Sequence, residues 1–347
     1  MPSGDIAQSG KEGLSAPARS KRGLNAAGTM RRYLFAATFG AALALLSFSG
    51  LLVALQFKGV LPPPAISNSE CVDGKLAFLR KNNPGNPNLL IIGSSVAWRH
   101  FDSSVATTMA PGTAPLNGGF CGLRANQIAF TARWLLERIP SVKQVIMITA
   151  PQDFETCDAP SEVFSADSAD AFVFRHASKW PFYFHYFDPI SLVRNAQAVA
   201  DERANKPTPN PMVFTKYGDG PLYVGHANGL VYGKLMGLDP ACFAAFRTMA
   251  QEFKAQHRTF MVVMTPINPA WQTLYDSDRR WMKAFATNLS KALNGTNAQL
   301  WNANSDAGLQ EASFTDAIHL RWSAVGPLSQ MIMQKLQPRK GGAGITP

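Results

Sequence analysis

One segment of this sequence limits the possible structures more than any other: the run from Tyr33 to Phe57 contains no charged residue over 25 positions. At 1.5 Å per residue, a helix of this length reaches across the roughly 30 Å hydrocarbon core of a bilayer. Arg31 and Arg32 precede the run, and only Lys58 follows it immediately. Because positive residues favour the cytoplasmic side, we expect the N-terminus in the cytoplasm and the residues after 58 outside it.

Two fates of this segment remain open at the level of sequence. A cleaved signal peptide is one, although the apolar run is long for that role and no clear A-x-A cleavage site follows it. An uncleaved anchor is the other, and we favour it because of the length of the run. The expected location is therefore the inner (cytoplasmic) membrane, with one transmembrane pass and a periplasmic domain.

Changes in composition along the 347 residues predict five segments. A Pro-rich stretch at 61–64 leaves the apolar run as a stiff spacer, and turn residues at 82–87 precede the first strand. The predicted segments are a disordered cytoplasmic tail (1–32), the anchor (33–57), a linker with a leading helix (58–87), an α/β domain (88–337) with an irregular insertion or cap (156–238), and a disordered tail (338–347).

The formal net charge of +10 is partly an effect of the N-terminal tail, because residues 1–32 hold six Lys/Arg against two Asp/Glu. No basic stripe alternates with aromatic residues, so we do not expect a nucleic-acid partner. The cysteines and histidines show no zinc-ligand spacing, so we expect no metal and no cofactor. The four cysteines allow one or two disulfides in an extracytoplasmic domain. A Cys121–Cys157 pairing is the one suggested by the predicted site loops.

Strands alternate with helices along the chain. Continuous apolar runs indicate buried parallel strands, and apolar residues repeating at three and four positions indicate helices. The expected strands are 89–92, 142–149, 260–264 and, more weakly, 298–301; the expected helices are about 75–81, 125–139, 239–257, 276–293 and 323–336. Residues 116–120 are expected to form a loop. This alternation predicts a three-layer α/β/α domain with a parallel sheet.

The residues that follow each strand are the candidates for chemistry, because sites in open parallel sheets lie beyond the carboxyl ends of the strands. The first strand ends at Gly93-Ser94-Ser95. Glycine permits a sharp turn into a helix, and the N–H groups and positive dipole at a helix N-terminus favour a developing oxyanion near Ser95. An ordinary serine N-cap is the competing interpretation.

A second candidate motif lies near the other end of the chain, in Phe314-Thr315-Asp316-Ala317-Ile318-His319-Leu320. An aspartate three residues before a histidine can orient the imidazole through one ring nitrogen and leave the other to accept a proton from a serine. A surface histidine beside a turn is the competing interpretation. The other five histidines are expected to be structural or exposed to solvent.

The order of these motifs resembles that of the SGNH (GDSL-like) hydrolase family. The resemblance covers about residues 88–155 and 255–337 and leaves the middle of the chain unmatched. It implies that Ser95 is the nucleophile, that His319 is its base and that Asp316 orients the base. It also implies that Gly119, or Gly118, offers a backbone N–H to the oxyanion.

The third block departs from the family pattern. The family has G-x-N-D, with an asparagine amide that donates to the oxyanion, whereas this chain has Ala150-Pro151-Gln152-Asp153. Gln152 can donate through the same kind of amide on a longer arm, and Asn117 is the alternative donor.

Three further residues beside these motifs are candidates for binding substrate. They are Trp98, Arg99 and Asp153, although core packing is the favoured role of Trp98.

The first block also differs, since it is G-S-S rather than G-D-S. This form resembles membrane-anchored members that work in O-acylation of cell-surface polymers, often with a multi-spanning membrane acyltransferase as partner. The resemblance implies a serine esterase or O-acyltransferase for O-acyl, chiefly O-acetyl, groups of an extracytoplasmic polysaccharide. The alternative is a catalytically weak domain of the same fold that binds glycan or serves as a scaffold for a membrane acyltransferase.

Overall fold

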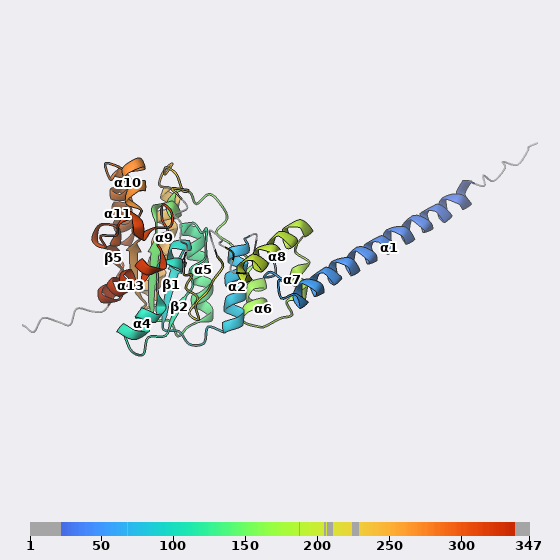
Figure 1. Cartoon of the computed structure of the whole chain (residues 1–347), viewed down its shortest axis with the longest axis horizontal. Coiled ribbons are helices and arrows are strands. Elements are labelled where there is room, and N and C mark those ends of the chain that lie inside the picture. Colours follow the sequence, from blue (N-terminus) through green and yellow to red (C-terminus); the bar gives the residue numbers. More distant parts are fainter. Residues whose placement is uncertain are drawn as a thin grey trace, which may run out of the picture. The chain divides into compact units, whose positions relative to one another are not determined.

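The computed structural model describes residues 22–67, 69–186, 188–204, 206, 211–223 and 229–336 (Figure 1). The chain divides into two compact units, residues 1–61 and 62–347, which are described separately. The predicted tail at 338–347 and the first 21 residues of the predicted tail at 1–32 lie outside the described residues.

The described part of the first unit consists mainly of the long helix α1 (Arg22–Phe57). Its part from Gly28 to Phe57 is long and apolar enough to cross a membrane, with a mean hydropathy of 2.0. The prediction that the whole of residues 1–32 is disordered was wrong, because the helix begins at Arg22 rather than at Tyr33. Residues 22–32 contain no proline and several good helix formers, so the helix continues in this direction.

The second unit is built on a sheet of five parallel strands in the order β2-β1-β3-β4-β5. The strands are β1 (Leu89–Gly93), β2 (Pro115–Asn117), β3 (Gln144–Thr149), β4 (Thr259–Met264) and β5 (Gln299–Asn302). Every residue of β1 is buried, as expected for a strand covered on both faces. The predicted α/β fold with a parallel sheet is confirmed, except that the first two residues of the expected loop at 116–120 belong to the short edge strand β2.

Helices cover both faces of this sheet. α9 (Pro240–Ala255) packs against α5 (Ala125–Arg138) and α11 (Arg280–Leu293), whereas α4 (Ser103–Met109) packs against α13 (Trp322–Leu336). Right-handed crossovers explain why the helices lie on two faces of the sheet. The chain moves in one direction across the sheet from β1 to β2 and in the opposite direction from β2 through to β5, so the connecting helices of the two parts cover opposite faces. Outside the insertion, the structure also describes the helices α2 (Glu70–Asn82), α3 (Ser95–Arg99), α10 (Pro269–Tyr275) and α12 (Ala303–Asp306), and 3-10 turns at Pro151–Phe154 and Glu311–Ser313.

The insertion at 156–238 is more regular than its composition indicates. Its described residues include the helices α6 (Ala166–Val173), α7 (Trp180–Tyr183) and α8 (Pro189–Arg203). α6 packs against α2, and the hydroxyls of Tyr183 and Tyr186 donate to the carbonyls of Pro62 and Pro63 at 2.6 and 2.8 Å. The insertion is thus bound to the segment that leads into α2.

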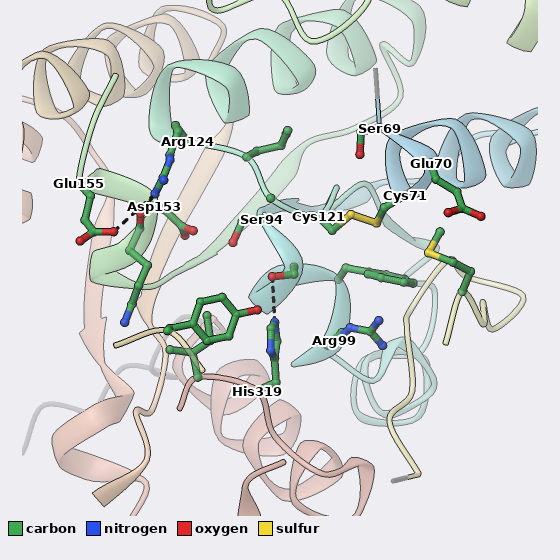
Figure 2. Close-up of a pocket in the computed structure, with 18 residues that line it drawn as sticks. Ser69, Glu70, Cys71, Ser94, Arg99, Cys121, Arg124, Asp153, Glu155 and His319 are labelled. Atoms are coloured by element: carbon green, nitrogen blue, oxygen red, sulfur yellow. Dashed lines mark hydrogen bonds and ion pairs between the residues drawn. A yellow bond between two sulfur atoms is a disulfide. The ribbon is translucent and has the colours of Figure 1, made fainter. Parts of the chain in front are cut away.

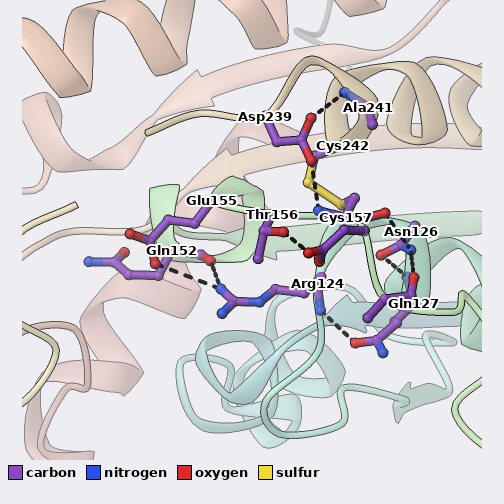
Figure 3. The surroundings of a disulfide bond; sticks show 12 residues. Arg124, Asn126, Gln127, Gln152, Glu155, Thr156, Cys157, Asp239, Ala241 and Cys242 are labelled. Atoms are coloured by element: carbon purple, nitrogen blue, oxygen red, sulfur yellow. Dashed lines mark hydrogen bonds and ion pairs between the residues drawn. A yellow bond between two sulfur atoms is a disulfide. The ribbon is translucent and has the colours of Figure 1, made fainter. Parts of the chain in front are cut away.

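Two disulfides join segments that are distant in sequence, Cys71–Cys121 and Cys157–Cys242. The expected Cys121–Cys157 pairing was therefore wrong. Cys121 lies beside the start of α2, whereas Cys157 lies beside the start of α9, where the Asp239 carboxylate accepts from the Cys157 N–H at 2.8 Å (Figure 3). The loops that carry Cys121 and Cys157 lie beside different helices, so each cysteine pairs with a cysteine of its own neighbouring helix.

Candidate active site

Ser95 is the first residue of α3, directly after the turn that ends β1. The turn requires Gly93, whose φ of 140° is unfavourable for other residues and whose added Cβ would lie 2.3 Å from the Ile148 carbonyl oxygen. As the first residue of a helix, Ser95 has a backbone N–H without an intrahelical acceptor. The turn therefore presents the Ser95 hydroxyl and N–H together at the carboxyl end of the sheet.

His319 lies within hydrogen-bond reach of Ser95, although 224 positions separate the two residues. Its Nε2 is 2.8 Å from the Ser95 Oγ, and its Nδ1 is 2.8 Å from Oδ2 of Asp316. A carboxylate only accepts hydrogen bonds, so Nδ1 carries the proton and Nε2 is left to accept from the serine. Asp316, His319 and Ser95 thus form one continuous chain of hydrogen bonds.

The Asp316 carboxylate is buried, yet it remains ionised. Burial alone would raise its pKa, but hydrogen bonds from the His319 ring and from the backbone N–H groups of Ile318 and His319 hold the pKa below its usual value. The two backbone bonds measure 2.8 and 2.7 Å to Oδ1. A fixed negative charge therefore faces the imidazole and stabilises the cation that forms when His319 takes a proton.

The Ser95–His319 pair opens into a cavity of about 570 Å³. Figure 2 shows Ser69, Glu70 and Cys71 at one end and Arg124, Asp153 and Glu155 at the other. The full lining is Ser69, Glu70, Cys71, Ser94, Ser95, Trp98, Arg99, Cys121, Gly122, Leu123, Arg124, Gln152, Asp153, Glu155, Met212, Tyr232, Ile318 and His319. Polar and charged residues outnumber apolar residues in this lining, and the Cys71–Cys121 disulfide forms part of the wall.

Gln152 is the one predicted oxyanion donor whose side chain remains available. The residue is only 7 % exposed to solvent, lines the cavity, and finds no hydrogen-bond partner for Nε2 or Oε1 within the described ranges. A buried amide without a partner is energetically costly, and such groups call for an explanation. An oxyanion that forms during a reaction would supply the missing acceptor.

The other predicted oxyanion donors are engaged elsewhere, which corrects the expectation for them. The Gly118 N–H donates to the Ile91 carbonyl at 2.8 Å, and the Gly119 N–H donates to Oδ1 of Asn117 at 3.0 Å. The Asn117 amide in turn donates to the carbonyls of Ala97 and Trp98 and to Asp219. These groups hold the β2 loop against α3 instead of facing the cavity.

The predicted substrate-binding residues all line the cavity. The guanidinium of Arg99 lies 4.0 Å over the Trp98 ring and donates to the carbonyls of Gly220 and Pro211 in the insertion. Asp153 accepts from the Thr149 hydroxyl at 2.8 Å and from the Ala150 N–H at 3.1 Å.

Burial changes the acidity of two of these side chains. It lowers the pKa of Arg99 to about 10 and raises the pKa of Asp153 to about 6. Arg99 bonds to the Gly220 carbonyl and Asp153 accepts from the Ala150 N–H, so both side chains also hold nearby backbone in place.

Several cavity residues were not identified from the sequence. The Tyr232 ring lies 5.6 Å from the His319 ring, and burial raises the pKa of its hydroxyl to about 12. Met212 and Tyr232 come from the insertion, where no motif marks them. Within the part of the chain that the structure describes, no group of three or more His, Cys, Asp or Glu side chains could hold a metal ion.

Comparisons with known proteins give structural likenesses only. No family model matches the chain, and no curated protein matches it. Three solved structures cover 72 % of this chain and 98 % of their own: a protein of Agrobacterium tumefaciens assigned as an arylesterase (12 % identity, TM-score 0.40), a carbohydrate acetylesterase of Sinorhizobium meliloti (11 %, 0.34) and an aryl esterase of M. smegmatis (11 %, 0.35). Likenesses this distant do not assign a function, so any assignment depends on the geometry of this chain's own residues.

Proposed function

We propose that this chain is a membrane-anchored, SGNH-type serine esterase or O-acyltransferase that acts on O-acyl groups, chiefly O-acetyl groups, of an extracytoplasmic polysaccharide. The observation that carries the proposal is the continuous hydrogen-bond chain from Asp316 through His319 to Ser95, at 2.8 Å for each link, at the edge of a polar cavity. Such a chain is the arrangement that activates a serine hydroxyl for attack on an ester.

The reaction follows from the positions of these groups. The Ser95 Oγ attacks the ester carbonyl carbon while His319 Nε2 takes the hydroxyl proton, and the carbonyl oxygen becomes an oxyanion. The Gln152 amide and the Ser95 N–H stabilise that charge. Collapse of the intermediate breaks the ester C–O bond, and His319 returns the proton to the departing alcohol. A water molecule or a sugar hydroxyl then attacks the acyl-serine and gives its proton to His319. The bond between the acyl carbon and Ser95 Oγ breaks, and His319 returns the proton to Ser95.

The lining of the cavity supports a polar substrate with a short acyl group. Charged side chains lie at both ends, and four of the eighteen lining residues have large apolar side chains: Trp98, Leu123, Met212 and Ile318. A long acyl chain would need a continuous apolar channel to compensate for the desolvation of these charges. A carbohydrate presents hydroxyls that can replace the lost hydration.

Two observations support an extracytoplasmic location. The helix that includes Gly28–Phe57 is long and apolar enough to span a bilayer, and the positive residues before it favour a cytoplasmic N-terminus. The second unit holds two disulfides, which persist in oxidising compartments such as the periplasm and are rare in the cytosol. A multi-spanning membrane acyltransferase is the partner we propose for a transferase that receives its acyl group at the membrane.

One observation favours a second candidate function, a catalytically weak scaffold or glycan-binding subunit. The N–H groups of Gly118 and Gly119 bind other acceptors, so the oxyanion site has fewer donors than the resemblance implies. In this second function, Ser95 would be dispensable, and the polar cavity would only bind glycan.

The test is turnover of p-nitrophenyl acetate by the full-length protein in detergent micelles, with intact-mass detection of an acetyl adduct. Ser95→Ala and His319→Ala are compared with wild type, and Ser290→Ala, an exposed position of α11, is the matched control. We expect turnover or an adduct in wild type and the control, and neither in the two site variants. Equal, trivial rates in all four folded proteins would contradict the enzyme and favour the scaffold.

A further inference from the structure

His100 is a fully buried histidine that the proposed reaction does not use. It follows the last residue of α3 as its C-cap, and its backbone N–H donates to the Val96 carbonyl. Its ring contacts two other segments: Nδ1 lies 2.6 Å from the Thr265 hydroxyl, and Nε2 accepts from the Leu320 N–H at 2.9 Å. One side chain therefore joins the nucleophile helix, the end of β4 and the loop that carries His319.

The contacts define the tautomer of this ring. An N–H group of the backbone can only donate, so Nε2 of His100 must be unprotonated and Nδ1 must carry the hydrogen. Nδ1 then donates to the Thr265 Oγ1. Burial lowers the pKa of His100 well below its usual value, and the neighbouring His319 adds to the effect. The neutral ring can thus keep accepting from Leu320 at neutral pH.

The Leu320 contact differs from the other bonds around His319. The His319 N–H donates to Asp316, and the His319 carbonyl accepts from the Thr315 N–H at 2.8 Å, so both bonds stay inside the loop 315–320. The bond from Leu320 to His100 instead connects that loop to α3, which begins at Ser95. His100 thereby links the base to the nucleophile through five residues of helix.

We infer that His100 is a positioning residue, whose Nε2 holds the Leu320 backbone and so keeps His319 Nε2 within hydrogen-bond reach of the Ser95 hydroxyl. The inference rests on the proposed function, because it assigns a role within that reaction. The hydrogen bond to Thr265 alone would anchor the ring without fixing the loop. Thr265 is itself held on the sheet, since its N–H donates to the Thr149 carbonyl at 2.9 Å.

Two substitutions separate these contacts. In His100→Gln, the longer amide reaches the place of Nε2, and its oxygen can accept from Leu320. In His100→Asn, the shorter amide takes the place of Nδ1 and keeps the Thr265 contact, but it does not reach Leu320. Both variants remove the ring from the core, so each loses packing, and they differ in which of the ring's two contacts remains: Thr265 in His100→Asn and Leu320 in His100→Gln.

The experiment measures kcat and KM of the full-length protein, together with thermal unfolding, for wild type and both variants. A displacement of the base by about 1 Å can cost about 100-fold in rate, so we expect His100→Asn to lower kcat by about 10- to 100-fold with KM nearly unchanged. We expect His100→Gln to recover most of that loss. Similar unfolding temperatures for the two variants would exclude a difference in folding.

A crystal structure of each variant makes the test independent of turnover. We expect the distance between Ser95 Oγ and His319 Nε2 to lengthen from 2.8 Å in His100→Asn and to stay short in His100→Gln. Equal kcat losses in both variants, or an unchanged distance in His100→Asn, would overturn the inference. If wild type itself shows no Ser95-dependent turnover, the proposed function fails, and the distances alone decide the role of His100.

Discussion

Replacing Gln152 with methionine separates catalysis from stability in this protein. The two side chains have similar length and volume, so the substitution removes the amide without opening a cavity. The Gln152 amide is buried and has no protein partner for either of its polar atoms within the described residues. Its removal from the resting protein therefore breaks no hydrogen bond to any of the described residues.

The structure gives opposite expectations for the two quantities. Loss of one oxyanion donor lowers kcat by about 100- to 1000-fold, or roughly 3–4 kcal/mol of transition-state stabilisation. Removal of an unpaired buried polar group relieves a desolvation cost of about 1–3 kcal/mol. Gln152→Met should therefore lose most of its activity while its unfolding temperature stays equal to that of wild type or rises.

The assay pairs initial rates on p-nitrophenyl acetate with thermal unfolding of the same preparations. Gln152→Asn is the matched variant, because it keeps the amide on the shorter arm found in the family pattern. Unchanged kcat in Gln152→Met would refute the role of this amide in stabilising the oxyanion. A drop of several degrees in unfolding temperature would show instead that the amide has a structural partner.

Two further predictions concern burial and covalent links. Burial raises the pKa of Asp153 to about 6, above its unfolded value of about 4, so the associated stability is present at low pH and is lost as the pH rises through 6. Relative to Asp153→Asn, wild type should lose roughly 2–3 kcal/mol of unfolding free energy between pH 4 and pH 8, and parallel denaturation curves for the two proteins would refute this. Replacing either the Cys71–Cys121 or the Cys157–Cys242 disulfide with serines should cost about 4 kcal/mol of stability, since the loops span 50 and 85 positions. Only the first disulfide lines the cavity, so esterase rates in folded preparations should fall more for that pair, and equal rates would contradict the reasoning.

Much of the fold was visible in local patterns. The strand β4 follows the continuous apolar run at 260–264. The helix α9 begins with the cap Asp239, whose carboxylate accepts from the Ala241 N–H at 2.8 Å, followed by a proline. These signals act over a few residues and survive in the sequence. The strand β2 has only three residues, which is too short to show an alternating hydrophobic pattern, so it is recognised only by its pairing with β1.

The candidate site shows the same division. Gly93-Ser94-Ser95 and the D-x-x-H motif could be read locally, because a turn glycine, a helix start and a three-residue spacing are local features. Three contacts could not be predicted from local patterns. They are the Cys71–Cys121 disulfide, the hydrogen bond from the Gly119 N–H to Asn117, and the ring contact between Tyr232 and His319. Each of these contacts depends on how the loops pack against one another, which local sequence patterns do not specify.

The sequence by itself determined the membrane-length apolar run, the alternation of strands and helices, and the residue types that a serine-based reaction requires. The tertiary structure alone decided which of those residues meet. It placed His319 2.8 Å from Ser95, left the Gln152 amide without a partner among the described residues, and made His100 a link between the two ends of the site. The physical reason is that propensity and periodicity act along the chain, whereas hydrogen-bond partners and burial depend on contacts across it.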